Sequence, residues 1–136
     1  MHLKIKKPTG GKLVKGRDHR LKYTMTWDDD THPNLTNDID AIYVTVKASD
    51  ALADDLAVIA FNSVDNPDQF ITVDAANGQG KIWIKKDDQD AIIPDTVQYC
   101  MDIVVIVSDG TEWEFVLDNN IMFTQPATRE TGYGLP

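Results

Sequence analysis

The sequence has a single cysteine and no long apolar run, and both absences limit what the protein can be. Cys100 stands alone among 136 residues, so no intramolecular disulfide can form, which excludes a disulfide-stapled scaffold and suits a reducing compartment. No apolar stretch approaches the roughly 18 residues that a membrane-spanning helix needs. The basic start, residues 1–7, lacks the apolar core of a signal peptide. We therefore expect one soluble domain that is made in a cytoplasm and has no membrane partner.

Residues for catalysis and for metal binding are also scarce. His2, His19 and His32 are the only histidines, and they lack the spacing of zinc ligands. The chain has no Gly-x-Ser-x-Gly motif and no complete phosphate-binding loop. Aspartates are abundant, and two roles stay open for them: a carboxylate pair for glycoside hydrolysis, and calcium binding in loops. We expect them mainly to form turns and confer solubility, and we predict a protein that is not an enzyme and has no cofactor and no metal.

Charge is distributed unevenly along the chain. Residues 1–22 contain eight lysines and arginines and one acid, Asp18, which gives +7, whereas residues 23–136 carry −16, for a net charge of −9. A basic segment on an acidic body indicates either a segment that docks on an acidic surface or a solvated tail. Because the acidic body would repel phosphate, we expect a protein partner and no nucleic acid.

Short alternating strands separated by turn residues make up most of the chain. Residues 20–27 and 39–47 alternate apolar and polar side chains, which is the period of a half-buried strand. Residues 97–107 are apolar on both faces and indicate a central strand, in which Cys100 is a small buried side chain. Asn77-Gly78 marks a hairpin turn. The other expected strands are 56–61, 70–74, 81–86, 113–117 and 121–123, with an interruption at 118–120.

About seven to eight short strands with regular turns predict an all-β domain, a sandwich or a barrel. Pro8-Thr9-Gly10-Gly11 breaks the N-terminal segment and indicates a hinge or turn. The expected organisation is therefore a basic N-terminal arm of residues 1–16, a β-sandwich domain of residues 17–125 and a polar C-terminal tail of residues 126–136.

The arm and one tryptophan are the candidate binding features. Leu3 and Ile5 alternate with lysines, so the arm is expected to add as an edge strand to the sheet of another subunit. Trp27 and Trp113 fall on the apolar phase of their strands and are expected in the core. Trp83 takes the outward phase, which makes it either an anchor for a partner or sugar, or a side chain covered within the monomer. The predicted partner-binding residues are Leu3, Lys4, Ile5, Lys6, Lys7, Lys12, Lys15 and Trp83.

The order of these features resembles that of a known group of proteins. Gly16-Arg17-Asp18 leads into a strand that ends at Trp27-Asp28, and later motifs follow in the same order. They are Pro33-Asn34-Leu35-Thr36, Ile71-Thr72-Val73-Asp74, Gly80-Lys81-Ile82, the strand with Tyr99, Asp102 and Ile103, and the closing Ala127-Thr128-Arg129. Over residues 16–130 the chain resembles small immunoglobulin-like β-sandwich proteins of tailed-bacteriophage virions, similar to the N-terminal domain of baseplate upper proteins. It departs from their pattern at Met101, which replaces an aromatic residue.

The resemblance implies an immunoglobulin-like antiparallel β-sandwich with arms at both ends and no enzymatic activity. It implies a structural component of a tailed-phage virion that contacts other virion proteins and copies of itself. Tail, baseplate or neck attachment is the first expectation, and capsid decoration is the second. The alternative from another class is a carbohydrate-binding or adhesin module that uses Trp83.

Overall fold

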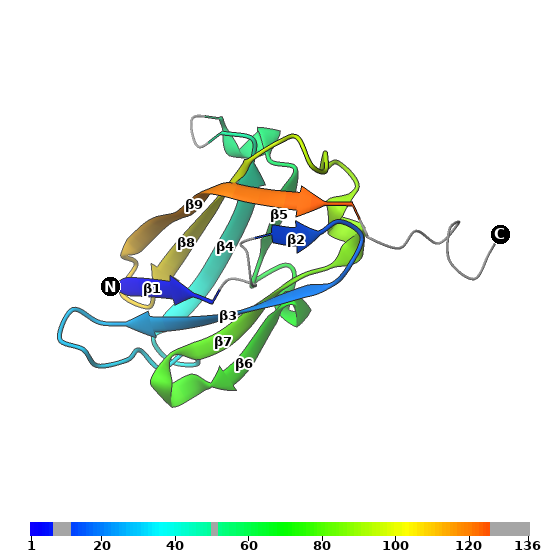
Figure 1. Ribbon diagram of the computed structural model, residues 1–136. Coiled ribbons are helices and arrows are strands. Elements are labelled where there is room, and N and C mark those ends of the chain that lie inside the picture. The colour runs from blue at the N-terminus through cyan, green and yellow to red at the C-terminus, as the bar shows by residue number, and fades with distance from the viewer. Residues whose placement is uncertain (7–11, 50–51, 126–136) are drawn as a thin grey trace.

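The computed structural model describes residues 1–6, 12–49 and 52–125. In these ranges the protein is all-β, with two sheets that face each other in a sandwich and no helix of seven or more residues (Figure 1). The four-stranded sheet has the order β1-β3-β7-β6, from β1 (His2–Ile5), β3 (His19–Thr26), β7 (Gln79–Ile84) and β6 (Phe70–Asp74). The five-stranded sheet has the order β2-β9-β8-β4-β5, from β2 (Lys12–Val14), β9 (Glu112–Thr124), β8 (Tyr99–Val107), β4 (Ile39–Lys47) and β5 (Ile59–Asn62). Neighbouring strands are antiparallel except β2 and β9, which run parallel.

The core lies between the sheets and follows the alternation of the sequence. Leu21, Tyr23 and Met25 of β3 are buried, as the period of two predicted. Val44 and Val46 of β4, in the five-stranded sheet, are fully buried on the other side of the core. Each such side chain contributes about 1.5–3 kcal/mol relative to an exposed position, so the paired apolar faces hold the two layers together.

The long apolar strand is central, as expected. β8 lies between β9 and β4, and Cys100 within it is buried. A tight turn at residues 108–110 joins β8 to β9, where the Val107 N–H donates to the Thr111 carbonyl at 2.9 Å. Gly110 has φ of 89° there, a left-handed conformation that glycine adopts without steric cost.

Tyr99 anchors the beginning of β8. Its side chain is 1% exposed, and its hydroxyl accepts a hydrogen bond of 2.9 Å from the backbone N–H of Ile93. Its ring meets Phe123 of β9 edge to face, with centroids 6.1 Å apart. The tyrosine thus ties the loop before β8 to the core and to the neighbouring strand.

Short 3-10 turns occupy several connections. They are η2 (Asp54–Leu56), η3 (Pro67–Gln69), η4 (Ala75–Asn77) and η5 (Lys86–Gln89). The strand expected at 56–61 therefore begins only at Ile59, after η2. The hairpin of residues 70–86 is present, and Gly78 at its turn has φ of 65°.

Two details of the sequence prediction differ from the structure. β9 is one continuous strand, and the predicted interruption at 118–120 is instead a shift in its register with β8. A bulge absorbs polar residues without ending a strand, which period-two reasoning does not anticipate. Trp27 and Trp113 pack against the core as expected but are only partly buried.

The N-terminal segment is the main difference. Residues 1–16 were predicted as an arm outside the sandwich, whereas residues 1–6 and 12–16 belong to it. β1 pairs with β3, and β2 pairs with β9 in the other sheet. Leu13 is buried in the core, and Leu3 and Ile5 pack against it. These apolar side chains gain burial within their own chain, so the segment does not need another subunit to order it.

Candidate protein-docking surfaces

The first candidate surface is the outer face of the four-stranded sheet, which is strongly basic. On β1, Leu3 and Ile5 take the inward phase, so Lys4 and Lys6 lie on the outer face. Arg20 and Lys22 follow on β3, then Lys81 on β7 and Lys85 just beyond it. Of the remaining predicted binding residues, Lys12 lies on β2 of the other sheet and Lys15 directly after it, so the structure does not bring them to this face. Lys7 lies outside the described residues.

Three of these lysines form a row across adjacent strands. Lys22 and Lys81 are direct partners in the β3–β7 register, and the Lys6 N–H donates to the Lys22 carbonyl at 2.8 Å. Neighbouring strands lie about 4.8 Å apart, and like charges placed opposite each other destabilise a sheet. Within the described part of the chain, none of the three forms an ion pair. The row therefore carries unbalanced positive charge that an acidic partner would neutralise.

Trp83 lies on the same face, at one end of the basic surface. Ile82 and Ile84 are fully buried, so Trp83 points outward as predicted, but it is half-buried. The Arg20 guanidinium lies 4.4 Å and the Lys85 ammonium 4.8 Å from the centroid of the indole ring. Such cation–π contacts hold both charges over the ring, so a sugar could stack there only by displacing them.

The indole nitrogen of Trp83 is buried and has no hydrogen-bond partner of normal geometry. The carboxylate of Asp18 is near enough for the indole to help lower its pKa, although the backbone N–H of Lys86 contributes more to that shift. We regard the contact with Asp18 as a long electrostatic one because the distance and angle of a hydrogen bond are not met.

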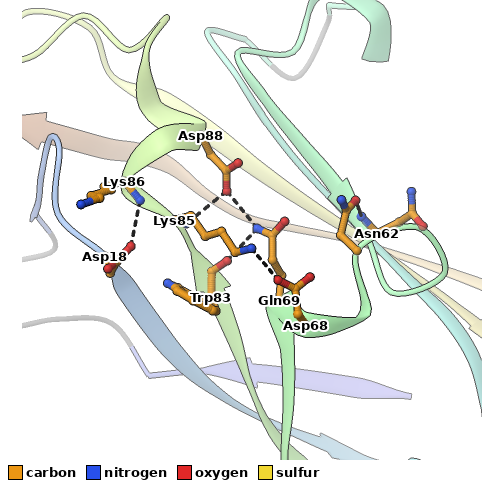
Figure 2. Close-up of polar contacts among 9 residues, drawn as sticks. Asp18, Asn62, Asp68, Gln69, Trp83, Lys85, Lys86 and Asp88 are labelled. Atoms are coloured by element: carbon orange, nitrogen blue, oxygen red, sulfur yellow. Dashed lines mark hydrogen bonds and ion pairs between the residues drawn. The ribbon is translucent and has the colours of Figure 1, made fainter.

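A network of polar contacts ties this end of the sheet to η3 and η5 (Figure 2). Lys85 forms an ion pair with Asp68, which lowers the pKa of the carboxyl and raises that of the ammonium. The Asp88 carboxylate accepts from the Lys85 N–H at 3.1 Å and from the Gln69 amide at 2.9 Å. Gln69 is itself buried and also donates to the Trp83 carbonyl. Asp88 is thus held by structural contacts, in contrast to a catalytic or metal-binding carboxylate left open to solvent.

A second buried glutamine fixes the chain where it enters β3. The Gln89 amide donates to the Arg17 carbonyl at 2.8 Å and accepts from the Gly16 N–H at 2.7 Å. Gln89 is 1% exposed, so both contacts are shielded from water. At the chain start, the Met1 ammonium pairs with Asp28 at 2.9 Å and lowers the pKa of that carboxyl, mainly through its hydrogen bond. Both ends of the predicted arm are therefore attached to the sandwich.

The second candidate surface is the first half of β9, which sequence reasoning missed. Residues 112–116 pair with β8 on one side, whereas β2 pairs with β9 only from Met122 onward. Glu112 and Glu114 are exposed, and Trp113 and Phe115 between them pack against the core. The alternation of acidic and aromatic residues was visible in the sequence, but only the sheet order shows that this part of β9 is an edge.

A buried ion pair lies on the outer face of the five-stranded sheet. Lys47 and Asp102 are 3% and 5% exposed, and their charged atoms are 3.1 Å apart. The Lys47 ammonium also donates to the Leu52 carbonyl at 3.1 Å, so Leu52 lies beside the pair. The Cys100 thiol donates to Asp102 at 3.5 Å. The alternation of apolar and polar residues in β4 put Lys47 on the polar face of the strand. In the structure this face is buried at Lys47.

Two hollows in the surface are small and contain little reactive chemistry. One, of about 280 Å³, lies along β5 beside Tyr43 and Asp65, and the other, of about 260 Å³, lies beside Tyr23 and Asp40. Pockets for small molecules usually span about 300–1,000 Å³. Each hollow is lined by one aspartate, whereas glycoside hydrolysis uses two opposed carboxylates.

The described ranges were compared with the requirements of a metal site and of a membrane-spanning helix. Among these residues, no group of three or more histidine, cysteine, aspartate or glutamate side chains is placed to hold a metal ion. None of their helices is long and apolar enough to cross a membrane. In comparisons with known proteins, no family model and no curated protein matches this sequence.

Proposed function

We propose that the protein is a non-enzymatic structural component of a tailed-phage virion that acts through protein–protein contacts. The observation that carries this proposal is the row of Lys6, Lys22 and Lys81 on the outer face of the four-stranded sheet. An unbalanced row of charge on a rigid sheet destabilises the isolated protein, and contact with an acidic protein removes the penalty. The net charge of −9 favours a protein over a nucleic acid as the partner of this face.

The strand order supports the immunoglobulin-like part of the proposal. In constant-type immunoglobulin domains, strands A, B, E and D form one sheet and strands G, F and C form the other. The order β1-β3-β7-β6 corresponds to A-B-E-D, and β9-β8-β4 corresponds to G-F-C. β5 occupies the place of the additional strand C′ of variable-type domains, and β2 that of a second segment of strand A.

Tyr99 gives independent support for this correspondence. Immunoglobulin domains have a tyrosine near the start of strand F, two residues before the second disulfide cysteine. The hydroxyl of this tyrosine forms a hydrogen bond with the backbone a few residues upstream. Tyr99 begins β8 and accepts from the Ile93 N–H, six residues upstream. Met101 takes the place of that cysteine and is buried, so an apolar contact replaces the disulfide.

The resemblance to tailed-phage proteins implies that the particle is a virion. The expected locations within the virion are ranked as in the sequence analysis. Tail, baseplate or neck attachment comes first and capsid decoration second, with assembly in the host cytoplasm. A small rigid sandwich with a charged face suits a subunit that occurs in many copies. The carbohydrate-binding alternative remains a prediction, but Arg20 and Lys85 over the Trp83 ring weigh against it.

Quantitative mass spectrometry of purified particles tests the proposal. Particles from the phage that encodes this chain should contain it at many copies, in constant ratio to the major tail or capsid protein after repeated gradient purification. Immunogold electron microscopy should then place it on the tail, baseplate or neck. A chain that stays in the lysate and is lost from particles with the abundant host proteins would rule out the proposed function.

A further inference from the structure

Two strand edges of the sandwich are unpaired in the described structure. β1 bonds to β3 on one side, and no described residue bonds to its other side. Residues 112–116 of β9 bond to β8 on one side, and none of the residues that the structure describes pairs with their other side. An open edge presents a row of backbone donors and acceptors to any strand that can approach it.

Both edges lie on the same flank of the sandwich. The chain passes from β1, the edge of the four-stranded sheet, to β2, which pairs with β9 at the edge of the five-stranded sheet. Only residues 6–11 separate β1 from β2, and a chain of this length spans at most about 25 Å. The arrows of β1, β2 and β9 point in the same direction in Figure 1, and β2 pairs with β9 in parallel.

The two edges are complementary in charge and in phase. β1 places Lys4 and Lys6 on the outer face and Leu3 and Ile5 inward. The β9 edge places Glu112 and Glu114 on the outer face and Trp113 and Phe115 inward. Charged residues on an edge strand ordinarily discourage pairing. Here like edges repel each other, whereas unlike edges attract.

We propose that two copies of this chain form a two-fold dimer in which β1 of each copy pairs with the β9 edge of the other. This inference deepens the proposed function by naming a partner, and it rests on the premise that the protein acts through protein contacts. A two-fold axis parallel to the strands places the flank of one copy, which carries β1 and the β9 edge, against the same flank of the other copy. The four-stranded sheet of one copy then lies beside the five-stranded sheet of the other. The same contact then occurs twice, which closes the assembly.

The symmetry keeps every side chain on the correct face. Strand direction is preserved, so β1 meets the partner's β9 in parallel. In the register that sets Lys4 beside Glu112, Ile5 lies beside Trp113 and Lys6 beside Glu114. The charged side chains then share the outer face and the apolar ones share the core side. The pairing also places a carboxylate at the end of the Lys6–Lys22–Lys81 row and so relieves its repulsion.

A different two-fold axis is disfavoured by the same charges. An axis perpendicular to the sheets would pair β1 with β1 and β9 with β9. Lys4 and Lys6 would then face lysines, and Glu112 and Glu114 would face glutamates, which is destabilising on both strands. Charge complementarity thus selects the β1–β9 contact.

The test is a charge-reversal experiment on the full chain, read by light scattering after gel filtration. The wild type should elute at twice the 15.2 kDa chain mass. Raising the salt from about 0.1 M to about 1 M, which shortens the screening length from about 10 Å to about 3 Å, should weaken the dimer. The variant K4E/K6E and the variant E112K/E114K should each be monomeric, with dissociation constants raised at least about tenfold.

Combining the reversed charges distinguishes a lost dimer contact from a variant that is merely misfolded. A mixture of K4E/K6E with E112K/E114K should form a heterodimer, because both contacts then join glutamate to lysine. A chain with all four reversals should again form a homodimer. The control D55K/D87K makes the same charge change as E112K/E114K at two exposed sites that belong to neither β1 nor β9, and it should remain dimeric.

Four outcomes would overturn the inference. Three are a monomeric wild type across the micromolar range, a dimer that both reversals leave intact, and reversed variants that fail to recombine. The fourth is the formation of assemblies larger than a dimer in the mixture, which would show an open contact between copies and reject the two-fold arrangement. If the protein does not dimerise but is incorporated into particles normally, only the dimer inference is refuted. If the protein dimerises but is absent from particles, only the virion assignment is refuted.

Discussion

The buried pair of Lys47 and Asp102 allows a sharp prediction about stability. Both side chains are almost fully buried on a face of the sheet that would otherwise meet solvent, and their charged atoms are 3.1 Å apart. Replacing either residue removes this contact and leaves the charge of the other residue in a buried site. Lys47→Met or Asp102→Leu should therefore each lower the free energy of unfolding by about 3–5 kcal/mol.

Such a loss is large for this protein. Natural domains are stable by only about 5–15 kcal/mol, so either single variant should lose at least about a fifth of that stability. For a domain of this length the melting temperature should fall by roughly 10–20 °C. The double variant K47M/D102L removes both charges and fills the space with apolar atoms. It should recover most of the loss, because replacing a complete buried pair is often neutral or stabilising by about 1–4 kcal/mol.

Urea unfolding followed by tryptophan fluorescence measures all three variants. The matched control is Asp68→Asn, which breaks the exposed pair with Lys85 and should leave the urea midpoint nearly unchanged because water screens that pair. The reasoning fails if the single variants unfold at the wild-type midpoint. It also fails if the double variant is as unstable as the sum of the singles, because the two side chains would then not act as a pair.

Further predictions concern the core and the pH dependence. Tyr99→Phe removes the acceptor of the Ile93 N–H and should cost about 1–3 kcal/mol in urea unfolding, with little change in the circular dichroism spectrum. Gly80→Ala should destabilise by about 1–3 kcal/mol, because a Cβ would lie 2.6 Å from the Cζ of Tyr23; a wild-type midpoint would mean that the ring moves freely. Burial raises the pKa of Tyr23 to about 12, so stability should hold up to about pH 10 and fall between pH 10 and 12, with phenolate absorbance appearing in the same interval. In acid, stability should change in the opposite direction, falling as the pH falls. Hydrogen bonds that several aspartates accept lower their pKa in the folded state, so the unfolded state takes up protons at a higher pH. The urea midpoint should therefore drop as the pH falls below about 4. These aspartates are Asp18, Asp28, Asp29, Asp68 and Asp109.

Much of the fold could be predicted from local pattern. The bounds of β4 were expected at 39–47 and are Ile39–Lys47, and those of β3 differ from the expected strand by one residue at each end. The outward phase of Trp83, the burial of Cys100 and the turn at Gly78 also followed from the sequence. Each depends on a period of two or on a glycine conformation, and both are properties of a few consecutive residues.

The site was less predictable, because its features join residues that are distant in the sequence. The row of Lys6, Lys22 and Lys81 exists only because β1, β3 and β7 are neighbours in one sheet. The same basic segment was predicted as an arm, because charge and a Pro-Thr-Gly-Gly break resemble a solvated tail. Nothing local indicates that Leu13 completes the core of the opposite sheet.

Local sequence sets which residues form strands, which side of each strand faces the core and where the chain turns, because alternation and turn chemistry act over a few residues. The order of the strands comes from tertiary packing, and so do the lysine row, the burial of Lys47 and Asp102, and the two edges that the described residues leave unpaired. The physical reason is that strand pairing is non-local. An alternating strand can pair with many others, and the choice among them depends on how the apolar faces of the whole chain pack together.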